Sequence, residues 1–245
     1  MFELKILYSG MINADECFHF YGQTPGKLID SPSWFYYLTD GKRKILVDTG
    51  MDGKEFTESC FPHTVTMGMP IEPLLRCAGT APEEITDIIF THLHWDHIGG
   101  LGHFINARMY CRPEEIEWAF SPEMLDDGYR RFFEKCLWPW KDRIIPTEKS
   151  PIEGITLLRT GGHSVGSQCV IADTKLGRTA LPGDVIARYR NVEENIPAGS
   201  VVNIDEAIQS IPAIMAAADV ILPSHDWLVA ERHPVIGMPE KAGNI

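Results

Sequence analysis

Three histidines and one aspartate stand within six consecutive positions of the segment THLHWDHIGG, residues 91–100. Imidazole nitrogens and carboxylate oxygens are donors that zinc and similar divalent cations accept in proteins. The segment offers no cysteine thiolate, which argues against a closed structural site built from sulfur ligands. The spacing therefore predicts a catalytic metal site instead of a structural one. The plainer alternative is a cluster of surface histidines.

The element before this cluster must hold it in place, and a buried strand is predicted there. Residues 85–90 are rich in β-branched side chains and end where the cluster begins. The candidate ligands are thus expected on a strand-to-helix loop, with Gly99 and Gly100 permitting a tight turn. A loop held by a rigid strand is a common place for catalytic groups.

The remaining pattern predicts strands followed by a helix in two successive halves of the chain. Further strands are expected over residues 2–8, 34–38, 44–47, 107–111, 155–159, 168–173, 178–181 and 220–222, with a hairpin turn at Asp40 and Gly41. Short helices are expected near residues 71–77 and from Pro113. A longer helix is expected with Asp205 as its cap and Pro212 as a bend. This order predicts an α+β fold of two sheets packed face to face with helices outside.

Seven aromatic side chains lie between residues 118 and 140. Core packing is the plainer interpretation of this region. The alternative is a lid or wall for an acyl or aromatic substrate, because ligand clefts are lined mainly by such side chains. We expect one domain over residues 1–245, in which about 112–150 could be an insertion that covers the substrate.

Composition and charge narrow the classes of partner. The formal net charge of −12 argues against a nucleic-acid partner, which usually requires a basic face. No apolar run approaches the roughly 20 residues that span a bilayer, and residues 1–10 do not resemble a signal peptide. Six cysteines without a Cys-x-x-Cys pair favour a reducing cytoplasm. We expect a cytoplasmic protein with a small-molecule substrate and no nucleic acid or membrane partner. The oligomeric state stays open, with a homodimer as one option.

More histidines and aspartates follow predicted strands in the second half of the chain. They stand in GGHS (161–164), PGD (182–184) and PSHD (223–226). An isolated histidine is more often structural, but three such strand ends, with glycine beside His163 and Asp184, favour convergence on the first cluster. Outside this set remain His19, His63, His103 and His233, with His103 expected to be structural and Asp226 expected to orient a loop.

With these residues the chain resembles the metallo-β-lactamase superfamily, whose pattern is His-x-His-x-Asp-His followed by a distant His, Asp and His. The resemblance covers nearly the whole chain and implies an αββα sandwich of two mixed sheets with the site at one edge. It implies one metal held by His92, His94 and His163, and a second held by Asp96, His97 and His225, with Asp184 as the bridge. Asp48 matches a position that supports the ligands in that family.

A site of this kind predicts hydrolysis. Two cations that share a hydroxide lower its pKa from about 15.7 toward 7 and polarise a substrate carbonyl. We expect Asp96 and Asp184 to be catalytic, Asp96 by holding the attacking hydroxide or passing its proton to the leaving group. Zinc is the expected metal, and Mn, Fe or Co would suit the same donors.

Among the branches of the superfamily, the N-acyl homoserine lactonases are the most similar. The resemblance rests on His-x-His-x-Asp-His-x-Gly-Gly, on Gly-His-Ser-x-Gly at 162–166 and on Ser-His-Asp at 224–226. It implies a lactonase with quorum-quenching activity. In that branch a tyrosine three residues after the bridging aspartate contacts the lactone carbonyl. Ala187 stands there in this chain, and Tyr189 or Arg188 is expected to replace it.

Other functions stay open. The same hydroxide could cleave a cyclic amide, a carbamate or a thioester, although only 20 residues follow His225, where thioesterases of the glyoxalase II type carry a helical domain. A transfer-RNA-processing role would require a basic arm that the sequence lacks. A non-catalytic binding protein that has kept the fold is the alternative from another class.

Overall fold

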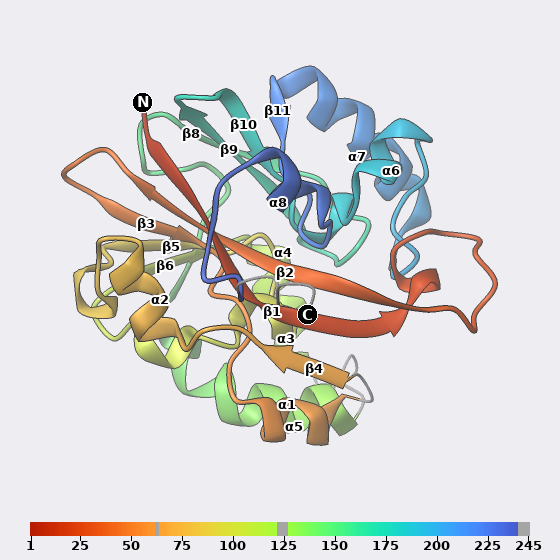
Figure 1. The fold of residues 1–245 in the computed structure, drawn as a ribbon, viewed down its shortest axis with the longest axis horizontal. Coiled ribbons are helices and arrows are strands. Elements are labelled where there is room, and N and C mark those ends of the chain that lie inside the picture. Colours follow the sequence, from red (N-terminus) through yellow and green to blue (C-terminus); the bar gives the residue numbers. More distant parts are fainter. Residues whose placement is uncertain (62–63, 122–126, 240–245) are drawn as a thin grey trace, which may run out of the picture.

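Two β-sheets form the middle of the molecule in the computed structural model, which describes residues 1–61, 64–121 and 127–239 (Figure 1). The larger sheet has the strand order β12-β1-β2-β3-β5-β6-β7, with β4 paired to β1. Its strands are β1 (Glu3–Asp15), β2 (Leu28–Thr39), β3 (Lys44–Val47), β4 (Thr64–Met67), β5 (Asp87–Ile89), β6 (Arg108–Cys111), β7 (Ile144–Pro146) and β12 (Val235–Ile236). The expected hairpin is confirmed as the antiparallel pair β2–β3, and β3, β5, β6 and β7 continue in parallel.

The smaller sheet has the order β11-β10-β9-β8. Its strands are β8 (Ile155–Arg159), β9 (Gln168–Thr174), β10 (Gly177–Leu181) and β11 (Val220–Ile221). β8, β9 and β10 are antiparallel, whereas β11 joins β10 in parallel after a crossover through a helix. The strands expected in the second half of the chain are therefore confirmed, and their loops lie at the edge where the sheets meet.

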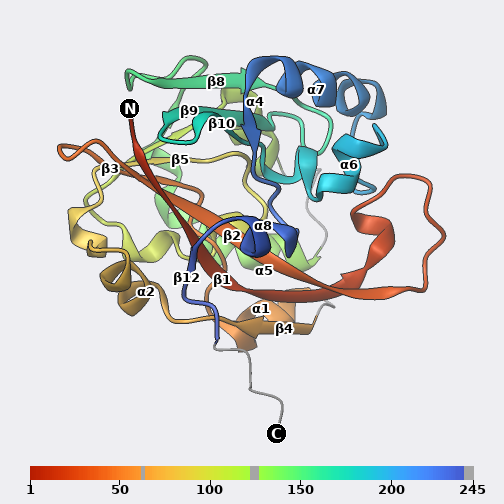
Figure 2. The same ribbon diagram turned by 45° about the horizontal axis from the view of Figure 1, so that its top comes forward.

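Helices cover the outer faces of both sheets. They are α1 (Lys54–Cys60), α2 (Ile71–Cys77), α3 (Trp95–Ile98), α4 (Pro113–Ala119), α5 (Asp127–Cys136), α6 (Tyr189–Glu193), α7 (Ile204–Ala217) and α8 (Leu228–Arg232). Short 3-10 turns are Glu16–Phe18, Pro82–Glu84, Leu101–His103, Trp138–Arg143 and Gly183–Ile186. Figures 1 and 2 show α1, α2 and α5 beyond the larger sheet, and α6 and α7 beyond the smaller one. The expected αββα sandwich is confirmed.

The central strand β2 shows why the sequence packs in this way. Trp34, Tyr36 and Leu38 join the apolar cluster between the sheets, whereas Phe35 and Tyr37 join the cluster under the outer helices. Because successive side chains of a strand point to opposite faces, a continuous apolar run fits only where both faces are covered. The run WFYYL therefore marks the inside of the sandwich.

One local expectation was wrong, and the physical reason for a second differs. The cap of α7 is Asn203, whose side chain accepts the backbone N–H of Glu206, and Asp205 lies inside the first turn. Gly99 and Gly100 form the expected turn after α3, but with ordinary negative φ angles. A Cβ on Gly100 would lie 2.5 Å from the carbonyl oxygen of Thr49. Close approach to the segment after β3 therefore requires these glycines.

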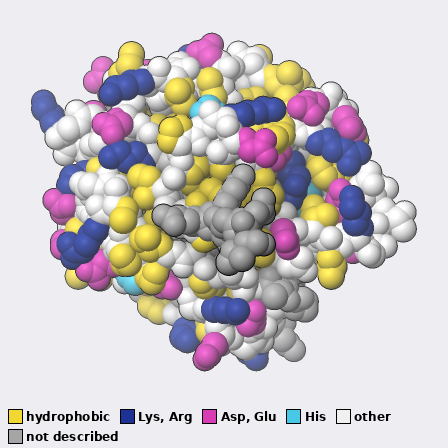
Figure 3. Space-filling view, viewed as in Figure 1, with side chains coloured by type: hydrophobic (Ala, Val, Ile, Leu, Met, Phe, Trp, Pro, Cys, Tyr) yellow, Lys and Arg dark blue, Asp and Glu magenta, His cyan; other side chains and the backbone are white. Residues whose placement is uncertain are grey.

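Surface and thiol chemistry complete the description. On the face drawn in Figure 3, Lys and Arg side chains alternate with Asp and Glu side chains. Within the described residues, no helix has the length and apolar character needed to cross a bilayer. All six cysteines are free thiols.

Candidate metal centre

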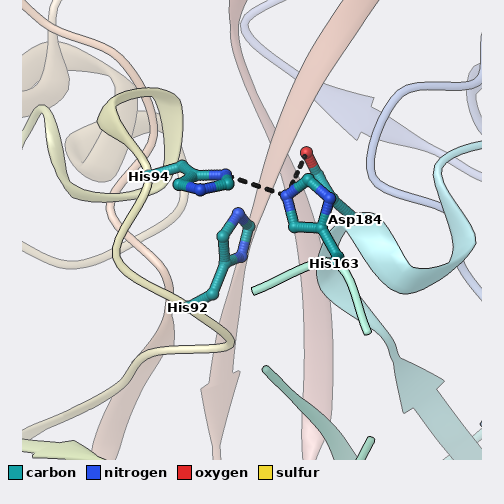
Figure 4. A group of neighbouring side chains, drawn as sticks. All are labelled: His92, His94, His163 and Asp184. Atoms are coloured by element: carbon teal, nitrogen blue, oxygen red, sulfur yellow. Dashed lines mark hydrogen bonds and ion pairs between the residues drawn. The ribbon is translucent and has the colours of Figure 1, made fainter. Parts of the chain in front are cut away.

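Four strand-end loops bring the candidate ligands together. The 91–97 segment follows β5, and His94 stands directly before α3, so that Asp96 and His97 lie on the helix itself. His163 comes from the β8–β9 loop, Asp184 from the turn after β10, and His225 from the loop after β11. Figure 4 shows His92, His94, His163 and Asp184 pointing toward one another from these separate segments.

The ligand atoms form two groups that share one carboxylate. The first group is His92, His94, His163 and Asp184, and the second is Asp96, His97, Asp184 and His225. Within each group the ligand atoms lie within 4.8 Å of one another. Oδ1 of Asp184 lies 3.0 Å from Nε2 of both His97 and His225, and Oδ2 lies 3.6 Å from Nε2 of His163. Asp184 is thus placed between the two groups.

A hydrogen-bond chain fixes the proton of His92 on the nitrogen that faces away from the cluster. The Thr91 hydroxyl donates to Oδ2 of Asp48 at 2.8 Å, so its oxygen is left to accept from Nδ1 of His92 at 3.1 Å. Nε2 of His92 therefore carries a lone pair, and this atom is buried without a hydrogen-bond partner. A buried nitrogen lone pair without a donor is what a metal ligand requires.

His163, His225 and His97 are oriented by the same principle. Nδ1 of His163 donates to the carbonyl of Ser200 at 2.6 Å, and Nδ1 of His225 donates to the carbonyl of Pro32 at 2.8 Å. Nδ1 of His97 faces Oδ2 of Asp48 at 2.8 Å. Each bond leaves Nε2 as the nitrogen that points at the shared carboxylate. Nε2 of His97 has no hydrogen-bond partner although Asp184 is near, because the contact lacks hydrogen-bond geometry.

The charges of the cluster require a cation. Among the described residues, Asp96 and Asp184 have only histidines as ion-pair partners. Burial lowers the pKa of His97, but Asp184, Asp96 and Asp48 outweigh burial and raise that pKa well above its usual value. Burial lowers the pKa of His92 well below its usual value, so that ring is neutral. The raised pKa of His97 shows that the buried carboxylates favour positive charge beside them, and divalent cations bound by these imidazoles and carboxylates would supply it; the residues present fit two such cations.

Asp48 is held in an unusual backbone conformation to reach these partners. Its φ angle is 62°, in the left-handed region that β-strand residues avoid, and its side chain also accepts the backbone N–H of Thr91 at 2.8 Å. The sequence expectation that Asp48 supports a ligand agrees with this contact to His97. Gly183 is needed nearby, because a Cβ there would lie 2.6 Å from the Thr91 hydroxyl.

Glu115 joins the two ligand loops from the first turn of α4. Its Oε1 accepts the backbone N–H of Leu93 at 2.9 Å, and its Oε2 accepts the Ser164 hydroxyl at 2.7 Å and the Gly166 N–H at 2.9 Å. Burial raises the pKa of Glu115, and these donors oppose the shift. The sequence analysis missed this residue, because one glutamate on a predicted helix carries no signal of its long-range partners.

A cavity of about 340 Å³ opens above the ligands. His94, Asp96, His163, Asp184 and His225 form part of its surface. Its apolar wall consists of Ile12, Ala14, Phe18, Phe61, Trp95 and Ala198. The rings of Phe61 and Trp95 stack with centroids 5.0 Å apart, and Tyr129 of α5 completes the wall beside His94. Most other aromatic residues of the 118–140 region pack in the core, Phe132 and Phe133 among them.

The two residues expected to meet the substrate carbonyl have other partners. Neither Arg188 nor Tyr189 lines the cavity, as far as residues 1–61, 64–121 and 127–239 define it. The Arg188 guanidinium donates to the carbonyl of Asp30 and to the Ser31 hydroxyl. The Tyr189 ring lies under the guanidinium of Arg232, 4.1 Å from it. Ala187 does line the cavity.

One histidine that the sequence left unassigned lies on the cavity wall. His19 follows the first 3-10 turn in the β1–β2 connection, is 7% exposed, and has its ring 5.7 Å from that of His225. Burial lowers its pKa to about 3, with His225 and Arg188 adding to the effect, so the ring is neutral at neutral pH. No motif could have found it, since it stands far from the ligands in sequence.

Two further residues outside the ligand set, His103 and Asp226, have structural partners. His103 pairs with Asp52 at 2.8 Å on the surface, as expected of a structural residue. Asp226 accepts the backbone N–H groups of Tyr189 and Leu228, both at 2.9 Å, and so orients its loop as expected. His63 lies outside the described residues.

Comparison with known proteins identifies the family. The model of the metallo-beta-lactamase superfamily matches residues 28–225. The chain belongs to this superfamily. A metallo-β-lactamase fold with two histidine and aspartate groups makes the chain a metal-dependent hydrolase.

Relatives within the metallo-β-lactamase superfamily place the chain near one branch. An N-acyl homoserine lactonase of a Bacillus species is 33% identical over 186 residues, which cover 71% of this chain and 72% of that protein. The N-acyl homoserine lactonase AttM of Agrobacterium fabrum is 24% identical over 166 residues, 65% of this chain and 62% of AttM.

Solved structures agree. A mutant of B. thuringiensis AiiA with N-decanoyl-L-homoserine bound at its active site is 28% identical, with a TM-score of 0.78 over 95% of this chain and 96% of AiiA. AidC, a dizinc quorum-quenching lactonase, shares the metallo-β-lactamase fold at 20% identity, with a TM-score of 0.73 over 99% of this chain and 92% of AidC.

Proposed function

We propose that this chain is a dinuclear metal-dependent lactonase that hydrolyses the ring ester of an N-acyl homoserine lactone or a related lactone. The observation that carries the proposal is the pair of ligand groups that share Asp184 beneath a largely apolar cavity. A relative at 33% identity is named N-acyl homoserine lactonase. A solved structure at 27% identity holds N-hexanoyl-L-homoserine at its catalytic metal centre, and this acid is what ring opening of the lactone yields.

Two divalent cations in these groups would supply an activated water and polarise the ester carbonyl. Partners on the far side of the ring orient the ligand nitrogens of four histidines: the Thr91 hydroxyl for His92, the Asp48 carboxylate for His97, and backbone carbonyls for His163 and His225. Asp184 is held in place by the Ser224 hydroxyl at 2.8 Å. Pre-oriented ligands of this kind reduce the reorganisation that the reaction requires.

We assign to Asp96 the transfer of a proton from the attacking water to the leaving group. Its Oδ2 lies 3.3 Å from Nε2 of His225 and 3.5 Å from Nε2 of His97, and the residue also lines the cavity. The water oxygen attacks the carbonyl carbon, and the Asp96 carboxylate takes the proton. When the ring C–O bond breaks, the same proton passes to the departing alkoxide oxygen.

The cavity wall suits an acyl group. Phe61 and Trp95 offer stacked apolar surface beside the ligands, and Tyr129 of α5 faces His94. We assign the wall function within the 112–150 region to α5, whereas α4 supports the ligand loops through Glu115. This arrangement keeps the region as part of a single domain over residues 1–245.

Zinc is the metal we propose, because imidazole-rich sets with a few carboxylates suit it; Mn, Fe and Co are the alternatives that metal analysis distinguishes. We propose a cytoplasmic location, which the six free thiols support. A homodimer is not required by the site, because every proposed ligand comes from one chain.

Metal analysis combined with a substrate panel tests the proposal. Protein loaded with zinc is expected to hold two equivalents and to open the ring of N-acyl homoserine lactones or other lactones. The reaction is measured by the release of protons from the acid that forms. Cyclic amides, carbamates and thioesters are run beside the lactones, and turnover of one of these without any lactone would replace the lactonase assignment. His94→Ala should lower metal content, and His103→Ala, outside the site, is the matched control.

A further inference from the structure

The ring of His19 belongs to a polar chain that starts outside the cavity. Nη2 of Arg188 lies 2.6 Å from the Ser31 hydroxyl oxygen, and that oxygen lies 2.8 Å from Nε2 of His19. Ser31 is fully buried, so its hydroxyl proton must find a protein acceptor. The hydrogen-bonded chain of side chains therefore runs from the Arg188 guanidinium, through the Ser31 hydroxyl, to the His19 imidazole on the cavity wall.

The direction of this chain decides the tautomer of His19. A guanidinium can only donate, so the Ser31 oxygen accepts from Arg188. The Ser31 proton is then free for Nε2 of His19. If Nε2 donated instead, no acceptor among the described residues would remain for the buried Ser31 proton. The network thus assigns the His19 proton to Nδ1.

Nδ1 of His19 is available to a molecule in the cavity. Within the described part of the chain this nitrogen has no hydrogen-bond partner, and it is not among the fully buried atoms that lack one. The residue lines the cavity next to His225. His19 therefore brings to the cavity lining a ring N–H that has no protein acceptor among the described residues.

The backbone of His19 is also fixed. Its carbonyl accepts the side-chain N–H of Asn191 at 2.9 Å, and Arg188 holds the carbonyl of Asp30 at 3.1 Å, beside Ser31. The tip of the β1–β2 connection is thereby tied to α6. A donor held by both its ring and its backbone is pre-organised for a substrate atom.

We propose that His19 is a catalytic residue whose Nδ1–H donates a hydrogen bond to the carbonyl oxygen of the scissile ester, with Ser31 and Arg188 as positioning residues that hold the donating tautomer. This inference rests on the proposed function. It gives Arg188 an indirect part in the site, and it supplies a side-chain donor to the cavity that Ala187 also lines, whose own side chain has no donor. Removing one donor aimed at a developing oxyanion typically costs on the order of 10²-fold to 10³-fold in kcat.

Three variants of one residue separate a donor from a merely structural imidazole. Nδ1 is bonded to Cγ, so the amide nitrogen of His19→Asn stands in its place, whereas the amide of His19→Gln stands at Nε2 and contacts Ser31. His19→Leu keeps the volume without either nitrogen. We expect kcat to fall about a hundredfold in the Gln and Leu variants with KM nearly unchanged, and to stay within about tenfold of the parent in the Asn variant.

Two outcomes would overturn the proposal. Equal activity in the Asn, Gln and Leu variants, whether high or low, would show that the Nδ1 position supplies no donor. A fall in zinc content in the Gln and Leu variants would show that His19 acts by supporting His225 instead. Zinc content is therefore measured in every preparation, and it is expected to equal that of the parent protein.

A spectroscopic measurement on the unaltered protein keeps the proposal testable if the variants fail to fold. Long-range ¹⁵N–¹H correlation of the histidine rings, assigned through the backbone resonances of the unaltered protein, is expected to show the proton of His19 on Nδ1. A proton on Nε2 contradicts the proposal. If the parent protein opens no lactone, the proposed function fails, and the same variants are compared on whichever substrate of the panel is hydrolysed.

Discussion

The metal cluster and the cavity wall differ in how their polar groups are held. In the cluster, the second nitrogens of His92, His97, His163 and His225 each have a protein partner, and the ligand nitrogens point inward. On the cavity wall, polar groups are few among apolar side chains, and Nδ1 of His19 has no hydrogen-bond partner among the described residues. The outer nitrogens of these four cluster histidines are bonded within the protein, whereas the donor on the wall is left for the substrate. Ligand identity and substrate identity are thus encoded in different parts of the sequence.

Replacing the shared carboxylate should give the largest loss of activity and of bound metal, because it alters the metal cluster and leaves the cavity wall unchanged. Asp184→Asn keeps the shape and the Ser224 contact but removes the charge that faces both ligand groups. The neutral amide cannot balance the charge of the cations that the two groups would hold, so we expect at least one of them to be lost. We therefore expect kcat/KM to fall about a hundredfold to a few thousandfold, with loss of bound zinc measured by mass spectrometry.

The Ser224→Ala variant is the control for that substitution, because it removes a hydrogen bond to Asp184 without changing the charge. It should keep both zinc ions and most of the activity. Normal zinc content and activity in Asp184→Asn would contradict the assignment of this carboxylate as a bridge.

Glu115→Gln should give the next largest effect, and it tests whether the cluster depends on support from α4. The amide can replace only one carboxylate oxygen, so the N–H groups of Leu93 or Gly166 lose their acceptor. Groups that support metal ligands typically contribute 10-fold to 100-fold in metal affinity. We expect zinc affinity to fall about tenfold in a chelator competition.

The neighbouring Glu114→Gln is matched to it in sequence and chemistry. Glu114 is half-buried and pairs with Arg112 and with Arg159 of β8, and none of its contacts among the described residues is with the ligand loops. Its zinc affinity should equal that of the parent. Equal affinities in the two variants would mean that Glu115 contributes to folding alone.

The contrast between cluster and wall also explains what the sequence could reveal. The ligand set was predictable because the spacing of His92, His94, Asp96 and His97 is short, and because glycine-flanked His163 and Asp184 follow strong strand patterns. The sandwich was predictable from the same strands, whose apolar runs need two covered faces. The strands β4, β7 and β12, two to four residues long, were not predicted from the sequence.

Tyr129 of the cavity wall belongs to the aromatic region that the sequence offered as a wall, but the position of His19 was not predictable, for a physical reason. His19 reaches the wall through a hairpin tip, and its tautomer depends on Ser31 and Arg188, which are distant in sequence. Proximity to Asp184 in sequence favoured Arg188 and Tyr189, yet the backbone after the 3-10 turn at Gly183–Ile186 directs both toward other partners. Contacts of this kind follow from tertiary packing, which no local pattern encodes.

The protonation of His19 gives a smaller effect, on stability rather than on rate. Its pKa of about 3 in the folded protein is below the ordinary value of 6.5, so the unfolded chain binds the proton first as the pH falls. The contribution of the neutral ring to the free energy of unfolding is complete above pH 6.5 and is lost progressively toward pH 3. Between pH 6.5 and 5.5 the loss should be about 1 kcal/mol.

Urea titrations of the parent and of His19→Asn at equal zinc concentration measure this effect. The asparagine cannot take up a proton, so its stability should fall less steeply over that interval by the same amount, about 1 kcal/mol. Parallel pH profiles would mean that His19 is solvated and titrates normally in the folded protein. The zinc ligands titrate in both proteins, and their contribution cancels in the difference.

Tyr189→Phe should have the smallest effect, and it decides which side of the site polarises the carbonyl. The phenylalanine ring keeps its place under the Arg232 guanidinium, and the backbone N–H still donates to Asp226. Because the hydroxyl does not reach the cavity wall, kcat/KM for a lactone should stay within about twofold of the parent. A tenfold fall in kcat would return the carbonyl contact to the segment after Asp184, where the resemblance to other lactonases places it. The near-neutral result expected here, set beside the hundredfold loss expected for His19→Leu, would place that contact on the β1–β2 connection instead.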